Sequence, residues 1–195
     1  PIKAMDDVSF INCGRYSNAI IKLDGSLWMW GNNTYGQFVG EYTYALTKVM
    51  EDVVAVSCGA NHFAAIKTDG SLWTWGKNSS GQLGIGSIDD EIHDPIKVMD
   101  EVVTVSCGDA YTAAIKKDGS LWTWGINING ELGNGTTENS GTPVKVMSNV
   151  SSVSCGELHT SAIKDDRPLC LCGYNRYGEL GNGTSENSSV PVKVM

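Results

Sequence analysis

The five-residue segment DGSLW occurs three times in this chain and reveals an internal repeat. The copies are Asp24–Trp28, Asp69–Trp73 and Asp118–Trp122, and each continues to a second tryptophan and a glycine. A Cys-Gly pair upstream keeps the same spacing in four places: Cys13-Gly14, Cys58-Gly59, Cys107-Gly108 and Cys155-Gly156. A period of about 20–50 residues is typical of solenoids, propellers and other arrays, so the repeat constrains the fold more than any other feature.

The second repeat shows the strands that we expect in each repeat. Short runs at Val53–Ser57, Phe63–Lys67, Ser71–Trp75 and Pro95–Met99 predict four strands, the first of them buried on both faces. Asp69-Gly70 is typical of a tight hairpin turn between the second and third strands. Four short antiparallel strands in a repeat of this length indicate a propeller blade. The sequence therefore predicts an all-β propeller array with four four-stranded antiparallel blades.

The paired tryptophans have a structural explanation. Because side chains alternate along a strand, Trp73 and Trp75 lie on one face of their strand. A single blade has little core of its own, and one indole buries about 150–250 Å². We therefore predict that the tryptophan pairs fill the layers between neighbouring blades and do not form a ligand cage. In the fourth repeat Cys170 and Cys172 replace the pair, which predicts a looser last blade.

The second repeat also resembles a known family. Its segments VSCGANHFAAIKTDGSLWTWGKNSSGQLGIGS and DPIKVM are similar to the regulator of chromosome condensation repeat, with its DG…WG hairpin, N..GQLG turn and TPV.V outer strand. The resemblance covers the chain as one array over 1–195, with repeats at 8–50, 53–99, 102–147 and 150–195. It implies a β-propeller, usually of about seven blades, in which one blade takes its outer strand from across the ring closure.

The chain departs from that pattern in ways that predict an arc or partial ring within a longer repeat protein. Only four repeats are present, and Pro1–Met5 matches the outer strands although no inner strands precede it. We expect Pro1–Met5 to be the outer strand of a preceding or closing blade. The end blades would then expose two apolar faces, which carry Trp28 and Trp30 at one end and Cys170 and Cys172 at the other. Because such patches favour association, we predict that the chain self-associates.

Composition argues against several classes of partner. The formal net charge is −8, whereas a nucleic-acid-binding surface needs Lys and Arg to displace counterions from phosphates. We therefore expect neither nucleic acid nor an anionic membrane as a partner. No apolar run approaches the roughly 18–20 residues of a spanning helix, so we expect no membrane insertion. The near-identical repeats, with their DGSLWTWG-like segments, resemble those of secreted or surface multi-repeat proteins of bacteria. This resemblance favours an extracellular or cell-surface location.

The six cysteines could form disulfides or bind a metal, but packing explains their positions better. The Cys-Gly cysteines occupy the same place at the end of a buried strand, and we expect successive ones to exceed the roughly 7 Å Cα separation of a disulfide. Cys170 and Cys172 do not have the C-x₂₋₄-C spacing of zinc ligands, so no metal site is predicted. Calcium held by acidic loops is the weaker alternative to simple solvated loops. Those loops contain Asp89-Asp90-Glu91, Glu138-Asn139 and Glu186-Asn187.

Catalytic motifs are missing from the sequence. There is no G-x-S-x-G elbow, phosphate loop or H-E-x-x-H pair. His62 and His159 follow the Cys-Gly pairs at a position where the other repeats have Ser17 and Tyr111. A position that accepts His, Tyr and Ser favours a polar anchor at a strand start over a general base. We therefore predict a protein that is not an enzyme and that uses no cofactor.

Candidate binding residues lie where the repeats differ, because function in repeat folds usually resides on loops held by a rigid scaffold. One set of variable turns follows the Cys-Gly pairs and another follows the Trp-Gly hairpins, so the turns should ring one or other face of the propeller. The Tyr, Arg, Asn and acidic residues there are typical of protein recognition, although ordinary solvated turns have a similar composition. The candidates are Arg15, Tyr16, Tyr35, Asn61, Lys77, Asp109, Asn129, Glu157, Tyr174 and Tyr177.

Three functions fit this pattern. We favour a non-enzymatic scaffold that binds an unidentified protein through its face loops, because propellers that resemble this family include a GTPase exchange factor and secreted inhibitors of β-lactamase. Exchange activity on a small GTPase is the first alternative, although the tight loops contain no insertion that could act as a wedge. A spacer without a ligand, in a surface protein, is the second. The fold does not decide among them, since function resides in sites on the fold.

Overall fold

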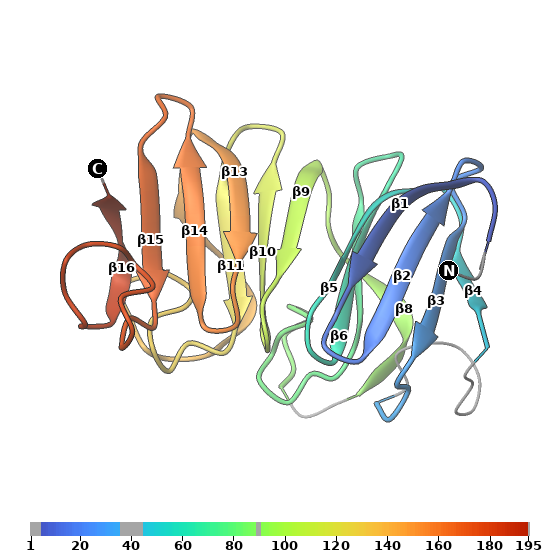
Figure 1. Cartoon of the computed structure of the whole chain (residues 1–195), viewed down its shortest axis with the longest axis horizontal. Helices are drawn as coiled ribbons and strands as arrows, with labels where there is room; N and C mark the ends of the chain where they lie inside the picture. Colours follow the sequence, from blue (N-terminus) through green and yellow to red (C-terminus); the bar gives the residue numbers. More distant parts are fainter. Residues whose placement is uncertain (1–4, 36–44, 89–90, 195) are drawn as a thin grey trace.

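The chain folds into four separate sheets, which we call the first to the fourth blade (Figure 1). The computed structural model describes residues 5–35, 45–88 and 91–194, and within these ranges it contains strands and no helix. Each sheet has four antiparallel strands in chain order. The strands of the first two blades are β1 (Val8–Cys13), β2 (Ser17–Lys22), β3 (Leu27–Gly31), β4 (Thr47–Met50), β5 (Val53–Cys58), β6 (His62–Lys67), β7 (Leu72–Gly76) and β8 (Ile92–Met99). Those of the third and fourth blades are β9 (Val102–Cys107), β10 (Tyr111–Lys116), β11 (Leu121–Gly125), β12 (Ser140–Met147), β13 (Val150–Cys155), β14 (His159–Lys164), β15 (Leu169–Gly173) and β16 (Ser188–Val194).

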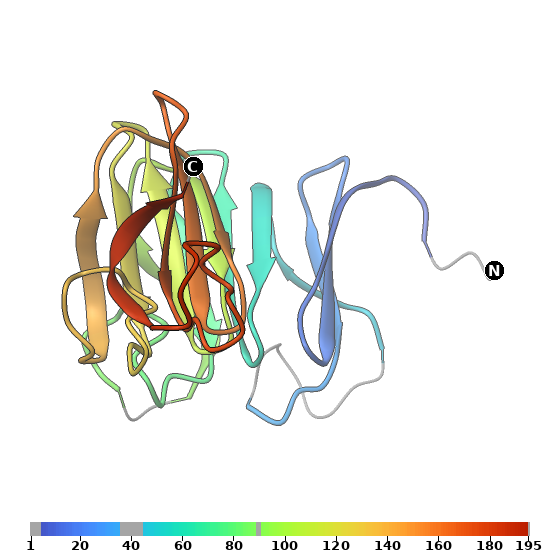
Figure 2. The same cartoon turned by 60° about the vertical axis from the view of Figure 1, so that its left-hand side comes forward.

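The four blades follow one another along an arc that does not close into a ring. The first strands β1, β5, β9 and β13 contact one another in succession on the inside of the array, and the fourth strands form the outside. The first and fourth blades lie at opposite ends of the longest axis, and the turned view keeps them apart (Figures 1 and 2). The predicted all-β propeller array of four blades is therefore confirmed as a partial ring. Residues 1–4 of the predicted outer strand Pro1–Met5 lie outside the described residues.

Two details of the predicted second blade differ from the structure. The outer strand β8 begins at Ile92, three residues before Pro95, because Gly76 at the end of β7 still pairs with Ile92. The prediction that Val53–Ser57 is buried on both faces was wrong at Val54, whose side chain is 55% exposed. A register shift between Val53 and Ala55 in the pairing with β6 turns Val54 toward solvent, as a bulge commonly does.

Apolar layers hold neighbouring blades together. We call the face of each blade that carries the tryptophan pair, or Cys170 and Cys172 in the fourth blade, its leading face, and the opposite face its trailing face. In the layer between the first two blades, Trp75 stacks on Phe63 with ring centroids 5.7 Å apart. Both rings pack in one cluster with trailing-face residues of the first blade, including Ile21 and Leu27. Trp124 lies in the next layer, so the predicted packing role of the second tryptophan is confirmed.

The cysteine pair of the fourth blade lies on a different face from the one predicted. Cys170 and Cys172 lie on the leading face of the fourth blade, where they are buried against the third blade. The Sγ atom of Cys172 lies 3.6 Å from the carbonyl oxygen of Glu131. The prediction that this pair forms an exposed end was therefore wrong, because the tryptophan position always faces the preceding blade. The two faces that no described blade covers are the leading face of the first blade and the trailing face of the fourth.

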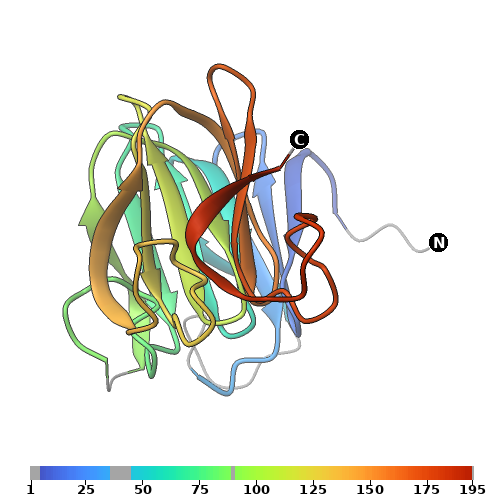
Figure 3. The same ribbon diagram turned by 90° about the vertical axis from the view of Figure 1, so that its left-hand side faces the viewer.

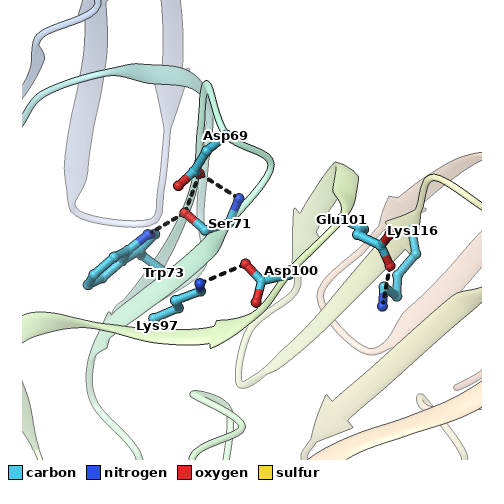
Figure 4. A network of polar contacts seen from close by, with 7 residues as sticks. All are labelled: Asp69, Ser71, Trp73, Lys97, Asp100, Glu101 and Lys116. Carbon is cyan, nitrogen blue, oxygen red and sulfur yellow. Dashed lines mark hydrogen bonds and ion pairs between the residues drawn. The ribbon is translucent and has the colours of Figure 1, made fainter.

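The repeated DGSLW segment builds a small hydrogen-bond network at each hairpin (Figure 4). In the second blade, Asp69 Oδ1 accepts hydrogen bonds from the Ser71 backbone N–H at 2.9 Å and the Ser71 hydroxyl at 2.6 Å. The Ser71 hydroxyl oxygen in turn accepts the indole N–H of Trp73 at 2.8 Å. The Ser71 hydroxyl bond and then its backbone bond lower the pKa of Asp69. Gly70 supplies a φ of 80°, so Asp, Gly, Ser and Trp each have a defined role in the motif.

Removing the hydroxyl of Ser71 tests this network. We expect Ser71→Ala to lower the free energy of unfolding by about 1–3 kcal/mol, because two hydrogen bonds are lost and each contributes about 0.5–1.5 kcal/mol. The measurement is urea unfolding followed by tryptophan fluorescence. Ser79→Ala, at an exposed serine in the same blade, is the control and should be neutral. Equal stability of Ser71→Ala and the wild type would show that the network contributes nothing.

Candidate protein-binding face

Both sets of variable turns lie at the same end of the blades, at the lower edge of Figure 1. Backbone hydrogen bonds tie each connection after a third strand to the Cys-Gly turn of the same blade. The Asn32 N–H donates to the Tyr16 carbonyl at 2.9 Å, and the Lys77 N–H donates to the Asn61 carbonyl at 2.9 Å. The same bond recurs in the third and fourth blades. The two predicted sets of turns therefore combine into one surface, which we call the pocket face.

A pocket of about 370 Å³ opens on the pocket face where the first strands of the four blades end. All four blades contribute their Cys-Gly pair to its wall, together with Arg15, Ala60, Asp109 and Glu157. We call it the axial pocket. Three of the ten predicted binding residues line it, and they come from the first, third and fourth blades. The fold thus places residues that are far apart in sequence around one hollow.

The cysteines in the wall of the axial pocket link the inner strands. The Cys107 N–H donates to the Ser57 hydroxyl at 2.9 Å, and the Cys107 thiol lies 3.5 Å from the Ser57 carbonyl. Burial raises the pKa of Cys107 to about 12 and that of Cys155 to about 11, so both stay protonated and unreactive near neutral pH. Among the described residues all six cysteines are free, and Cys13 is exposed. The prediction of a buried strand end was wrong for Cys13, because no described blade precedes it.

Arg15 and Asp109 form an ion pair at the axial pocket. One guanidinium nitrogen of Arg15 lies 3.7 Å from Asp109 Oδ1, and the guanidinium also lies 5.4 Å from the centre of the Tyr16 ring. The pair joins the first blade to the third. Because both side chains are partly exposed, the pair contributes little to stability. The same exposure leaves the charged groups and the Tyr16 ring accessible to a partner.

The remaining predicted residues form separate contacts around the pocket face. The ammonium of Lys77 lies 4.8 Å from the centre of the Tyr35 ring, which joins the first two blades. Asn129 accepts a hydrogen bond from the Asn187 side chain at 3.1 Å. Tyr174 and Tyr177 make an edge contact on the fourth blade with centroids 6.2 Å apart, and Tyr177 is 82% exposed. The structure therefore arranges the candidates as one central group and three peripheral contacts.

Sequence reasoning missed the residues that hold the long connections in place. Asn127 is fully buried, and its side-chain oxygen accepts the Leu132 N–H at 2.9 Å. Asn78 and Asn175 make the same bond in the second and fourth blades. Each of these asparagines follows the third-strand glycine by two residues, so their regular spacing is a signal that could have revealed them. They position the turns of the pocket face and offer nothing to a ligand.

Within residues 5–35, 45–88 and 91–194, no three His, Cys, Asp or Glu side chains gather into a metal site. In the proposed calcium loops, the side chains of Asn139 and Asn187 instead accept backbone N–H groups of Asn127 and Asn175, and residues 89–90 lie outside the described part. The described ranges contain no helix with the length and apolarity that a membrane crossing requires.

Comparisons with known proteins agree on a family and a fold. A family model for the RCC1-like domain matches residues 1–195. The structure resembles human WBSCR16 with a TM-score of 0.88 and 23% identity, over 100% of this chain and 55% of that one. It resembles yeast RCC1 (Prp20), solved with Kap60 bound, with a TM-score of 0.88 and 21% identity, over 100% of this chain and 50% of that one. Among curated protein sequences the comparison finds no match. At these identities the solved structures show the fold alone, and this chain spans about half of their length.

Proposed function

The chain belongs to the RCC1-like domain family, and from this membership we propose that it is a non-enzymatic scaffold that binds another protein through its pocket face. The observation that carries the proposal is the convergence of variable side chains from three blades on the axial pocket. Arg15, Tyr16 and Tyr177 are exposed on this face. Arginine and tyrosine are among the residues that most often dominate binding energy at protein interfaces.

The yeast relative supports a protein as the class of partner. Yeast RCC1 (Prp20) was solved with Kap60 bound, and a second structure of Prp20p was described with its binding to Gsp1p and histones. We infer only that the partner of this chain is a protein, because the sequence identity to these chains is 20–21%. The side chains on the pocket face of this chain, and not those of the yeast protein, would determine which protein it binds.

The environment of the titratable groups near the axial pocket supports a binding role over catalysis. The Cys107 thiol is held protonated by burial, and nucleophilic catalysis requires a thiolate. His62 is completely buried, and burial lowers its pKa to about 4. A general base needs contact with its substrate and a pKa near the working pH. Neither group meets these requirements, whereas the exposed Arg and Tyr side chains suit recognition.

Variants at opposite ends of the blades test the proposal. We expect Arg15→Glu and Tyr177→Ala to weaken binding of the cognate protein by about tenfold or more, as expected for interface hot spots. Lys117→Glu and Leu23→Ala, at exposed sites in hairpin turns of the opposite end, are the matched controls. Quantitative affinity purification with all five proteins identifies binders that depend on the pocket face. Calorimetry with the purified binder then measures the dissociation constants.

Two results would contradict this function. If every protein retained by the wild type were retained equally by Arg15→Glu and Tyr177→Ala, the pocket face would not be the binding surface. If the purified chain accelerated nucleotide release from a small GTPase, exchange activity would replace the scaffold role. The exchange assay uses fluorescent GDP and the GTPase encoded by the same organism. A binder lost only with the pocket-face variants, without nucleotide release, supports the scaffold.

A further inference from the structure

A second pocket lies at the end of the blades opposite to the pocket face. Its volume is about 410 Å³, and its wall combines the hairpin of the first blade, residues 22–25, with the start of the second blade, residues 52–54. The hairpins between second and third strands lie at the upper edge of Figures 1 and 3, whereas the pocket face lies at the lower edge. We call this second hollow the hairpin pocket. Its walls belong to two neighbouring blades inside the array, so it does not depend on what adjoins the first or the fourth blade.

Two exposed apolar residues line the hairpin pocket. Leu23 is 74% exposed and Val54 is 55% exposed. Val54 is turned outward by the register shift in its strand. At the repeat position of Leu23 the other blades have polar residues, namely Thr68, Lys117 and Asp165. The apolar wall is therefore particular to the hairpin of the first blade.

Asp52 places a carboxylate without a partner at the hairpin pocket. Within the part of the chain that the structure describes, this carboxylate makes no hydrogen bond and no ion pair. In the third blade Glu101 has the same repeat position, and its carboxylate pairs with Lys116 at 3.3 Å (Figure 4). The corresponding lysine of the second blade, Lys67, has its ammonium 5.6 Å from the centre of the Trp73 ring instead. Because aspartate is also one methylene shorter than glutamate, the second blade leaves this carboxylate for an external cation.

The other charged groups of the hairpin pocket leave the negative charge of Asp52 uncancelled. Asp24 and Lys22 also line the pocket, with opposite charges. Hydrogen bonds from Ser26 are the main cause of the lowered pKa of Asp24, and the charges of Lys22 and Lys48 lower it further. Lys22 thus offsets Asp24, and one net negative charge remains at the pocket. The net charge of −8 on the whole chain adds a long-range attraction for a cationic partner.

We propose that the hairpin pocket binds an arginine side chain of another protein. The aliphatic part of the arginine packs against Leu23 and Val54, as long charged side chains commonly cover apolar surface. Its guanidinium pairs with Asp52, because a planar fork of N–H groups donates two parallel hydrogen bonds to one carboxylate. Lysine has a single compact ammonium, so arginine suits this combination better. The hairpin pocket lies at the opposite end from the pocket face, so this binding goes beyond the function proposed above.

A short peptide with a single arginine tests the proposal. The probe is the tripeptide glycine-arginine-glycine with both ends blocked, and its binding is followed through the backbone amide signals of the isotope-labelled chain. We expect saturable shifts confined to the residues that line the hairpin pocket, with a dissociation constant of about 1–10 mM for so small a ligand. Asp52→Asn should weaken the binding by about fivefold, the loss expected for an exposed ion pair. This substitution keeps the turn, since the fourth blade has Asn149 at the same position with φ of 60°, against 61° at Asp52.

Asp165→Asn is the matched control, because it removes the same charge at an exposed site in the hairpin of the fourth blade, outside the hairpin pocket. It should bind the peptide as the wild type does. A peptide with citrulline, which has the shape of arginine without its charge, should give no saturable shifts. The proposal would be overturned by a wild type that shows no shifts at about 20 mM peptide, or by equal binding to Asp52→Asn. Equal or tighter binding of the lysine peptide would also overturn it, since charge alone would then be recognised. Binding that prefers arginine, weakens in Asp52→Asn and persists in Asp165→Asn supports the site, and none of these outcomes bears on the pocket face.

Discussion

Replacing Trp75 with alanine is expected to lower the free energy of unfolding by about 3–5 kcal/mol, the usual cost of truncating a fully buried tryptophan. The indole of Trp75 is completely buried in the layer between the first two blades, and its ring stacks on Phe63 at 5.7 Å. Alanine would leave a cavity between two sheets that have little core of their own. Urea unfolding followed by circular dichroism measures the loss.

Trp30→Ala is the matched control for this prediction. Trp30 has the same repeat position as Trp75, and its side chain is half-buried because no described blade covers the leading face of the first blade. We therefore expect its truncation to cost about half as much. Equal losses for the two variants would show that burial between blades does not set the contribution of the tryptophan.

The repeat made the fold predictable from local signals. Asp69-Gly70 and its equivalents place the hairpins, and alternation places Trp73 and Trp75 on one face. Neither signal says which neighbour a face meets, since that depends on the order of blades in space. For this reason the sequence predicted Cys170 and Cys172 on the exposed face of the fourth blade, whereas they lie on its covered leading face. The exposure of Val54 depends on a register shift, which a single sequence does not reveal.

The sequence predicted which turns form the candidate site but not how these turns are arranged in space. The Arg15–Asp109 ion pair joins blades whose residues are separated by two repeats, so it follows from the curvature of the array. Nothing in the sequence around either residue specifies that curvature. Asn127 does not stand out for a different reason: binding residues are predicted at positions that vary between repeats, whereas this asparagine recurs. The recurring asparagine holds the connections of the pocket face in place, and the varying residues lie on that face.

His62 is expected to make the stability of the protein depend on pH between about 6.5 and 4. Its ring is completely buried, and Nε2 lies 2.9 Å from the Thr112 hydroxyl. Among the described residues Nδ1 has no hydrogen-bond partner. Burial lowers the pKa of His62 from 6.5 to about 4, so the folded protein holds the ring neutral. Cys107 and Tyr111 in the next blade stay neutral over this range, because burial raises the pKa of each.

The sign of the effect follows from which state binds the proton. Between pH 6.5 and 4 the unfolded chain protonates this histidine and the folded chain does not, so stability falls as the pH decreases. The difference in pKa corresponds to a loss of about 3 kcal/mol of stability, which has not begun well above pH 6.5 and is complete below pH 4. Urea unfolding at pH 7.5, 5.5 and 4 measures it in the wild type, in His62→Gln and in the control His93→Gln at an exposed histidine. We expect His62→Gln to remove most of this loss and His93→Gln to preserve it; parallel pH profiles for the wild type and His62→Gln would show that the buried ring is not the cause.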